Sequence, residues 1–133
     1  MSNHLRILTV EDEAEVAQLL ALVLGGPTSK VTHVCNGEEA LAKIAADPKP
    51  FDVVITDHNM PKMTGLQLVG KLRAGHFGGK IVVLSAHLTH ENVQAYTKLK
   101  VDLMLSKPFD VNDLRKKVDS LLEVTAVHEH SGR

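Results

Sequence analysis

Polar side chains with complementary chemistry stand at the ends of several apolar runs of the sequence. In chain order they are Glu11, Asp12 and Glu13 after residues 5–10, Asp57 after residues 51–56, Ser85 at the end of residues 80–85, and Lys107 after residues 101–105. Carboxylates that share a site repel one another, and carboxylate oxygens with room for water suit Mg²⁺. A lysine ammonium and a serine hydroxyl add hydrogen-bond donors suited to a phosphoryl group. These residue types predict a site for a divalent cation and a phosphoryl group, provided that the fold brings them together.

Taken singly, each of these residues has an ordinary explanation. Acidic residues at the start of a helix complement the helix dipole. An aspartate at the end of a strand is often a turn residue, and a lysine before a proline is usually a surface side chain. The functional interpretation therefore depends on all of them reaching one edge of one sheet.

The order of apolar patterns predicts that arrangement. Five strand-like runs, at residues 5–10, 30–35, 51–56, 80–85 and 101–105, alternate with five helical patterns. The apolar stripes of those helices are Val16, Leu19, Leu20, Val23 and Leu24; Leu41, Ile44 and Ala45; Leu68, Val69 and Leu72; Val93, Tyr96 and Leu99; and Val111, Leu114, Val118, Leu121 and Leu122. The alternation predicts an α/β fold of parallel strands with helices on both faces. Ligands in such sheets bind at the carboxyl ends of the strands, where the polar residues stand.

Four motifs together resemble the receiver domain of two-component response regulators, of the CheY-like, single-domain type. They are Val10-Glu11-Asp12-Glu13, Asp57 with Met60-Pro61 and Gly65, Val83-Leu84-Ser85-Ala86, and Lys107-Pro108-Phe109. The resemblance covers residues 5 to about 123. It implies a flavodoxin-like, doubly wound five-stranded parallel sheet of strand order 2-1-3-4-5 with five helices. The receiver domain would then occupy residues 1–124, and residues 125–133 would form a flexible C-terminal tail.

The resemblance also implies the role of each reacting group. Asp57 would accept a phosphoryl group from a phosphohistidine on a sensor histidine kinase or a histidine phosphotransfer protein. Lys107 would bind a phosphoryl oxygen, and the Ser85 hydroxyl would turn toward the acyl phosphate. A cis peptide bond would precede Pro108.

A metal set follows from the same resemblance. Asp12, Asp57 and Glu11 would hold Mg²⁺, with Glu11 acting partly through water. The backbone carbonyl of Asn59 would supply a further ligand.

One region departs from the family pattern. The position three residues before Lys107 is commonly Tyr or Phe in receivers, and here it is Met104. Because a thioether chain is flexible and has no ring to rotate, a turning aromatic side chain at this position cannot be the readout. Met104 could switch by repacking, the output surface could lie elsewhere, or the protein could pass phosphate on instead of signalling by shape; a simple core filler is as good an interpretation as these three together. Tyr96, the one tyrosine, belongs to the same region, and core and interface placement stay open for it.

Composition bounds the class of protein. A chain of 133 residues that is 44% hydrophobic is large enough for one globular domain. A formal net charge of −1 gives no reason to expect direct binding of nucleic acid. No apolar run reaches the roughly 18 residues of a membrane span, so we expect a soluble, cytoplasmic protein. The single cysteine, Cys35, excludes an internal disulfide, and we expect it to be packed and inert.

We therefore expect a signalling switch that takes up a phosphoryl group and signals, or passes phosphate, to a downstream protein target. Its own chemistry would be Mg²⁺-dependent self-phosphorylation and autodephosphorylation at Asp57, and a phosphorylation-dependent dimer is compatible with it. The alternative is a phosphorylation-independent, receiver-like interaction module. An aspartyl phosphatase of the haloacid dehalogenase type is disfavoured because Asn59 stands where a second aspartate is needed. A Rossmann enzyme is disfavoured because the chain lacks G-x-G-x-x-G.

Overall fold

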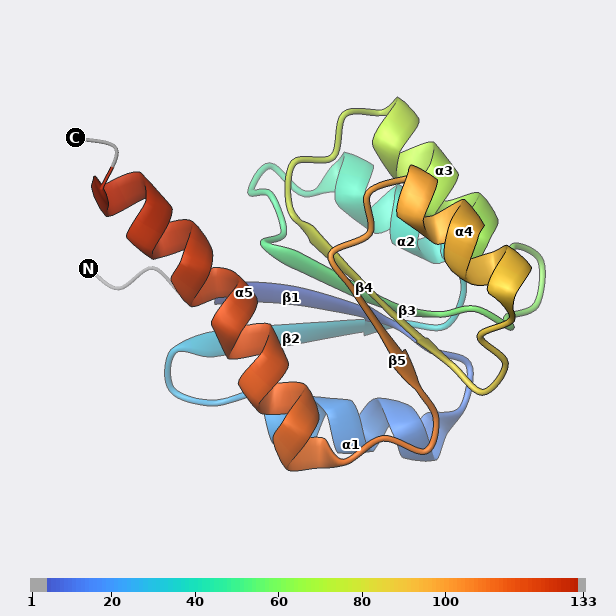
Figure 1. Ribbon diagram of the computed structural model, residues 1–133, viewed down its shortest axis with the longest axis horizontal. Helices are drawn as coiled ribbons and strands as arrows, with labels where there is room; N and C mark the ends of the chain where they lie inside the picture. The colour runs from blue at the N-terminus through green and yellow to red at the C-terminus, as the bar shows by residue number, and fades with distance from the viewer. Residues whose placement is uncertain (1–4, 132–133) are drawn as a thin grey trace.

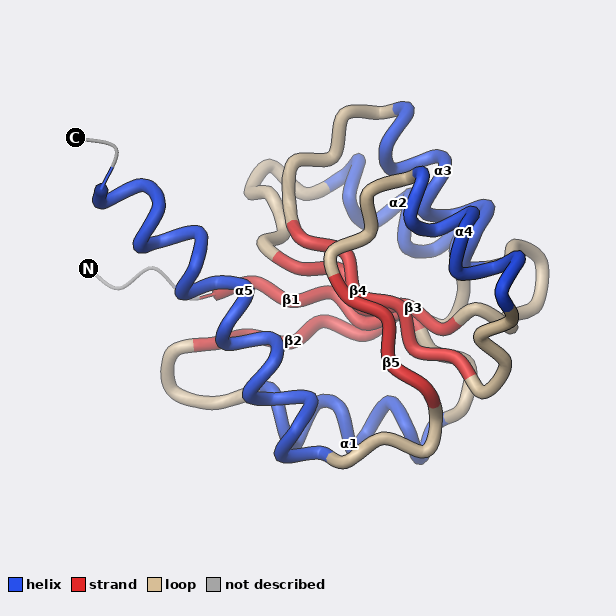
Figure 2. Tube along the Cα trace, in the orientation of Figure 1, coloured by secondary structure: helices blue, strands red, loops and turns tan. Residues whose placement is uncertain are grey.

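The strands form one parallel sheet at the centre of the molecule. The computed structural model describes residues 5–131, with side-chain environments for residues 5–122. Its sheet has the order β2-β1-β3-β4-β5, and all neighbouring strands are parallel (Figure 2). The strands are β1 (Leu5–Val10), β2 (Ser29–Val34), β3 (Val53–Asp57), β4 (Lys80–Ser85) and β5 (Leu103–Ser106). The strand order and direction confirm the predicted doubly wound fold.

Helices cover both faces of this sheet. They are α1 (Ala14–Leu24), α2 (Gly37–Ala46), α3 (Gly65–Ala74), α4 (His90–Lys98) and α5 (Val111–Ser131). Helices α1 and α5 lie on one face, and α2, α3 and α4 lie on the other (Figure 1). Because a helix returns the chain between successive parallel strands, the carboxyl ends of all five strands lie at the same edge of the sheet.

Alternate strand residues face two separate apolar cores. On β4, Ile81 and Val83 pack into the core under α2, α3 and α4, while Val82 and Leu84 pack into the core under α1 and α5. None of these four side chains is more than 1% exposed. A parallel strand covered on both faces needs apolar residues at every position, which is what its sequence supplies. This double burial makes the central strands rigid supports for the side chains at their ends.

Side-chain caps fix where two helices on the α2–α4 face begin. The Asn36 side chain accepts a hydrogen bond from the Glu39 backbone N–H (2.9 Å) at the start of α2. At the start of α3, Thr64 and Gln67 form a reciprocal capping box, with distances of 3.2 and 2.9 Å. Such caps satisfy backbone groups that the first helical turn leaves without partners.

Three strands differ from the sequence prediction at both ends. The structure begins β2 at Ser29, β3 at Val53 and β5 at Leu103, where residues 30, 51 and 101 were expected. Before β3, Asp52 binds Arg6 through its backbone N–H and also through its carboxylate, and the regular ladder starts only after it. These strands end at Val34, Asp57 and Ser106, where residues 35, 56 and 105 were expected, so Asp57 is the last residue of β3 and not the first residue beyond it.

Three side chains lie on surfaces where packing was predicted. Leu19 of α1 is 39% exposed, and Ala45 of α2 and Cys35 are exposed as well. An apolar stripe predicts which side of a helix faces the sheet but not how wide a strip the sheet covers. Cys35 follows β2, which is an edge strand with a neighbour on one side alone.

Helix α5 continues past residue 124, where the sequence analysis ends the domain. The backbone of residues 125–131 is helical, and this part of α5 extends beyond the sheet in Figure 1. Residues 132 and 133 of the predicted tail lie outside the described residues, and the flexibility of the tail stays a prediction. Within residues 5–131, no helix has the length and apolar character needed to cross a membrane.

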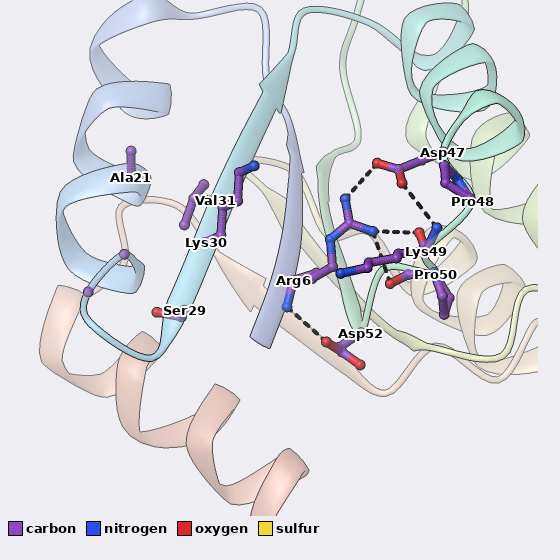
Figure 3. A pocket seen from close by; sticks show the side chains of 12 residues that line it. Arg6, Ala21, Ser29, Lys30, Val31, Asp47, Pro48, Lys49, Pro50 and Asp52 are labelled. Atoms are coloured by element: carbon purple, nitrogen blue, oxygen red, sulfur yellow. Dashed lines mark hydrogen bonds and ion pairs between the residues drawn. The ribbon is translucent and has the colours of Figure 1, made fainter. Parts of the chain in front are cut away.

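Arg6 joins β1 to the segment that enters β3, at the amino edge of the sheet. Its guanidinium donates to the Asp47 carboxylate (2.6 Å) and to the carbonyls of Lys49 and Pro50, and it lies 4.5 Å from the centre of the Phe51 ring. Several of these residues line an open hollow (Figure 3). The hydrogen bond from Arg6 lowers the pKa of Asp47. Arg6, one of the basic residues that line this hollow, therefore anchors the segment that enters β3, at the edge of the sheet opposite the predicted site.

The Arg6–Asp47 pair makes stability depend on pH. A folded-state pKa below the ordinary value of 3.8 stabilises the fold above that pH, and the contribution is lost as the pH falls through the folded pKa. We expect Asp47→Asn to be less stable than the wild type at neutral pH and the difference to shrink below pH 3.8. Urea unfolding across this range measures it, with exposed Asp119→Asn as control. A difference that does not vary with pH would contradict this account.

Candidate functional site

The carboxyl edge of the sheet brings the predicted site residues together. Glu11 directly follows β1 and Asp57 ends the adjacent strand β3, where Val10 pairs with Thr56. Glu11 is 1% exposed and Asp57 is 6% exposed. Lys107 directly follows β5 and is also largely enclosed. The carboxylates of Glu11 and Asp57 and the ammonium of Lys107 are therefore largely shielded from water at the same edge of the sheet.

An acidic triad of Glu11, Asp12 and Asp57 forms the centre of the site. One carboxylate oxygen from each residue lies within 4.8 Å of the others. The Lys107 amine bridges two of them, at 3.1 Å from Asp57 Oδ2 and 3.2 Å from Glu11 Oε1. Asp12 is exposed, so the triad opens to solvent on its side. The site is therefore lined by charged side chains and is accessible to solvent beside Asp12.

Burial and like charge act on Glu11 in the same direction. Burial raises the pKa of Glu11, the neighbouring Asp57 charge raises it further, and Lys107 offsets part of the effect. Burial lowers the pKa of Lys107, but the charge of Glu11 and the hydrogen bond and charge of Asp57 outweigh it, so the pKa is raised overall. Lys107 therefore stays protonated, and the triad carries more negative charge than one ammonium neutralises.

The chemistry of this donor set fits a hard divalent cation. Mg²⁺ binds one or two protein carboxylates and keeps several waters, and the triad offers both buried oxygens and an open, exposed side. A cation there would relieve the repulsion that raises the pKa of Glu11. Within residues 5–122, the carboxylates of Glu11, Asp12 and Asp57 are thus suited to hold such an ion.

Glu11 also organises the start of α1. Its second carboxylate oxygen accepts the backbone N–H of Glu13 at 3.2 Å, while its first oxygen contacts Lys107. Glu13 itself reaches within 3.5 Å of the Lys107 amine. The sequence analysis placed Glu13 at this edge but gave it no role. Its position in an unbroken acidic run was the available signal.

The other predicted residues occupy the same rim. Ser85 ends β4, is fully buried, and its hydroxyl accepts the backbone N–H of His87 at 3.0 Å. Asn59 lies two residues after Asp57 and is exposed, and its carbonyl as a metal ligand stays a prediction. The peptide bond between Lys107 and Pro108 is cis, as the resemblance implied.

Tyr96 belongs to the core and not to an exposed interface. It is 0% exposed, and its hydroxyl lies 2.6 Å from His58 Nδ1, with the two rings edge to face. Burial raises the pKa of Tyr96, and the charge of Asp57 adds to the effect. Met104 packs against the same apolar core. The sequence offered no signal for the contact between His58 and Tyr96, because the two residues are 38 positions apart.

Gly65 stands where no side chain fits. A Cβ atom there would collide with the Asp57 carbonyl oxygen and would lie 2.9 Å from both His58 Cα and the Tyr96 hydroxyl. The Gly65 backbone N–H donates to the His58 carbonyl at 2.8 Å. The absence of a side chain lets α3 begin directly against the end of β3.

Comparisons with known proteins place this chain in a family. The family described as the response regulator receiver domain matches residues 7–119, and the chain belongs to it. A response regulator receiver protein from Anaeromyxobacter sp. (strain Fw109-5) is 35% identical over 106 residues, covering 80% of this chain and 44% of the relative. The regulatory protein KdpE of Staphylococcus aureus is 32% identical over 127 residues, covering 95% and 53%. The chain spans 22% to 54% of the length of such curated relatives.

Solved structures agree with this family. The chemotaxis response regulator CheY4 of Vibrio cholerae has a TM-score of 0.78 and 30% identity, covering 89% of this chain and 98% of that chain. A CheY-like receiver domain from Methanospirillum hungatei JF-1 has a TM-score of 0.87 at 24% identity, covering 95% and 99%, and supports the fold alone. The predicted receiver family and CheY-like fold are confirmed.

Two glycines of α3 provide a matched test of the crowding around Asp57. We expect Gly65→Ala to lower the free energy of unfolding by about 1–3 kcal/mol, since its Cβ must displace backbone. Gly70→Ala on the same helix meets nothing within 4 Å and should raise stability by about 0.5–1 kcal/mol. Urea unfolding of both variants measures the difference. Equal stability of the two would show that the space at Gly65 is not restrictive.

Proposed function

We propose that Asp57 is the phosphoacceptor of this receiver domain. The donor is a phosphohistidine on a sensor histidine kinase or a histidine phosphotransfer protein, and the phosphorylated domain signals, or passes phosphate, to a downstream protein. The observation that carries the proposal is that the carboxylates of Glu11 and Asp12 and the amine of Lys107 all lie next to the Asp57 carboxylate. Membership of the receiver family supports the same conclusion.

The chemical step is an in-line displacement at phosphorus. An oxygen of the Asp57 carboxylate forms a bond to phosphorus as the phosphorus–nitrogen bond of the phosphohistidine breaks. The imidazole nitrogen leaves with the bonding electron pair, and an acyl phosphate remains on Asp57. Because phosphoryl transfer requires mainly positioning and charge neutralisation, a carboxylate fixed at the end of a fully buried strand is well suited to it.

The surrounding residues divide the remaining tasks. Lys107, now paired with Asp57 Oδ2, would bind a phosphoryl oxygen once the carboxylate is esterified. The Ser85 hydroxyl, on the adjacent strand, would turn from the His87 N–H toward that phosphate. Asp12, Glu11, Asp57 and the Asn59 carbonyl would hold Mg²⁺, which when bound neutralises charge on the acceptor and the donor.

Metal binding is testable without phosphorylation. Mg²⁺ that binds the folded triad should raise the free energy of unfolding, by about 2.7 kcal/mol when its free concentration is about 100 times the dissociation constant. Asp12→Asn should lose most of this gain, while Asp119→Asn, an exposed carboxylate outside the triad, should keep it. Thermal or urea unfolding over a Mg²⁺ titration measures the effect. An equal gain in both variants would place the ion elsewhere.

Phosphorylation itself is tested with acetyl phosphate and Mg²⁺. The wild type and Asp119→Asn should gain the mass of one phosphoryl group, and Asp57→Asn should gain none, because an amide oxygen is too weak a nucleophile. Intact-mass spectrometry measures the labelled fraction, and removal of Mg²⁺ should reduce it.

Two outcomes would overturn the assignment. Full labelling of Asp57→Asn would place the acceptor on another residue. An unlabelled wild type that still binds Mg²⁺ would favour a phosphorylation-independent interaction module.

A further inference from the structure

A continuous chain of contacts runs from the Asp57 carboxylate to the middle of α4. The backbone N–H of His58 donates to Asp57 Oδ1 at 2.8 Å. The imidazole of the same residue is hydrogen-bonded through Nδ1 to the Tyr96 hydroxyl at 2.6 Å. Tyr96 is the one wholly buried residue of α4. One residue, His58, thus contacts the carboxylate with its backbone and α4 with its side chain.

The position of the Tyr96 hydroxyl favours its hydrogen bond to His58 over any other hydrogen-bond partner. A buried hydroxyl without a hydrogen bond is costly, and this one is enclosed between the His58 ring and the backbone of Gly65. The two rings meet edge to face, with centroids 5.7 Å apart and an interplanar angle of 79°. Packing and hydrogen bonding therefore hold the imidazole and the tyrosine in one relative position.

The His58 peptide is restrained as tightly as its side chain. Its N–H is shared between Asp57 Oδ1 and the Leu84 carbonyl of β4, and its carbonyl accepts the Gly65 N–H at 2.8 Å. Because the contact with Tyr96 limits rotation of the His58 ring about its own side-chain bonds, a shift of Tyr96 is passed to a peptide whose N–H contacts the Asp57 carboxylate. Conversely, a change at Asp57 that alters this N–H contact is transmitted to the ring and to α4.

We propose that Tyr96 is a positioning residue for Asp57 and couples α4 to the phosphoacceptor through His58. The proposal rests on the function proposed for Asp57. Because coupling between two positions is reciprocal, a residue that lets α4 influence Asp57 also lets the state of Asp57 bias α4. The element under this control is α4, whose other residues lie at or near the surface.

The test removes the polar groups that form the link and keeps an aromatic ring at each position. Tyr96→Phe deletes the hydroxyl alone, and His58→Phe deletes the ring nitrogens. Each should slow labelling by acetyl phosphate about three- to tenfold, because each loses the hydrogen bond that holds His58, the residue whose backbone N–H orients the Asp57 carboxylate. Thr97→Val is the matched control, because it removes the adjacent hydroxyl of α4, which bonds the Val93 carbonyl and not His58. It should label at the wild-type rate.

The double variant separates a linked role from mere packing. If Tyr96 acts through His58, the variant carrying both substitutions should label no more slowly than the slower single variant. A double variant whose slowing equals the product of the two single effects would overturn the route through His58. Tyr96→Phe that labels like Thr97→Val would overturn the proposal outright.

A second measurement follows α4 itself. Beryllofluoride with Mg²⁺ should shift the backbone amide NMR signals of α4 in the wild type and in Thr97→Val, and this shift should be lost in Tyr96→Phe and in His58→Phe. Persistence of the α4 response in both link variants would contradict the coupling. Should Tyr96→Phe unfold, His58→Phe tests the same bond from its other end. A wild type that cannot be labelled would overturn the proposed function together with this inference, whereas a labelled wild type with unaffected link variants would overturn this inference alone.

Discussion

The confinement of negative charge at the carboxyl edge of the sheet is the constraint on which the rest of the site depends. Glu11 and Asp57 are almost wholly buried and close enough to raise the pKa of Glu11. Such a pair is costly unless a cation accompanies it. The Lys107 amine meets that requirement in part, and it arrives from a residue 96 positions away from Glu11. The single Lys107 ammonium does not neutralise all the negative charge of the triad, and this remaining negative charge favours binding of a further cation.

The sheet is packed between two apolar cores, and this packing keeps the buried charges close together despite their repulsion. β3 is buried at every position, and β1 at its last four, so the strands that position Asp57 and Glu11 cannot move apart to separate the charges. Because Gly65 has no side chain, α3 can pack directly against the end of β3. A stiff apolar interior therefore holds the Asp57 carboxylate in place despite the repulsion, which is a general way of preorganising a charged side chain.

Helix α4 contacts the residue next to Asp57 through one buried side chain. Tyr96 belongs to the apolar core under α2, α3 and α4, yet its one polar atom meets the residue that follows Asp57. Met104 stands where receivers commonly have Tyr or Phe, and it packs against that core with a flexible, apolar side chain. In this domain the tyrosine that contacts His58 comes from a helix, and its contact is a hydrogen bond as well as packing.

The sequence by itself determined the alternation of strands and helices, the receiver family and the identity of the residues at the strand ends, because apolar periodicity and short motifs are local properties of the chain. Only the tertiary structure decided that Lys107 bridges Glu11 and Asp57, that Glu13 comes within reach of it, and that Tyr96 meets His58. It also decided that Leu19 and Cys35 stay exposed. These outcomes depend on how far each helix covers the sheet and on which distant segments the crossovers bring side by side, and no local pattern encodes either quantity.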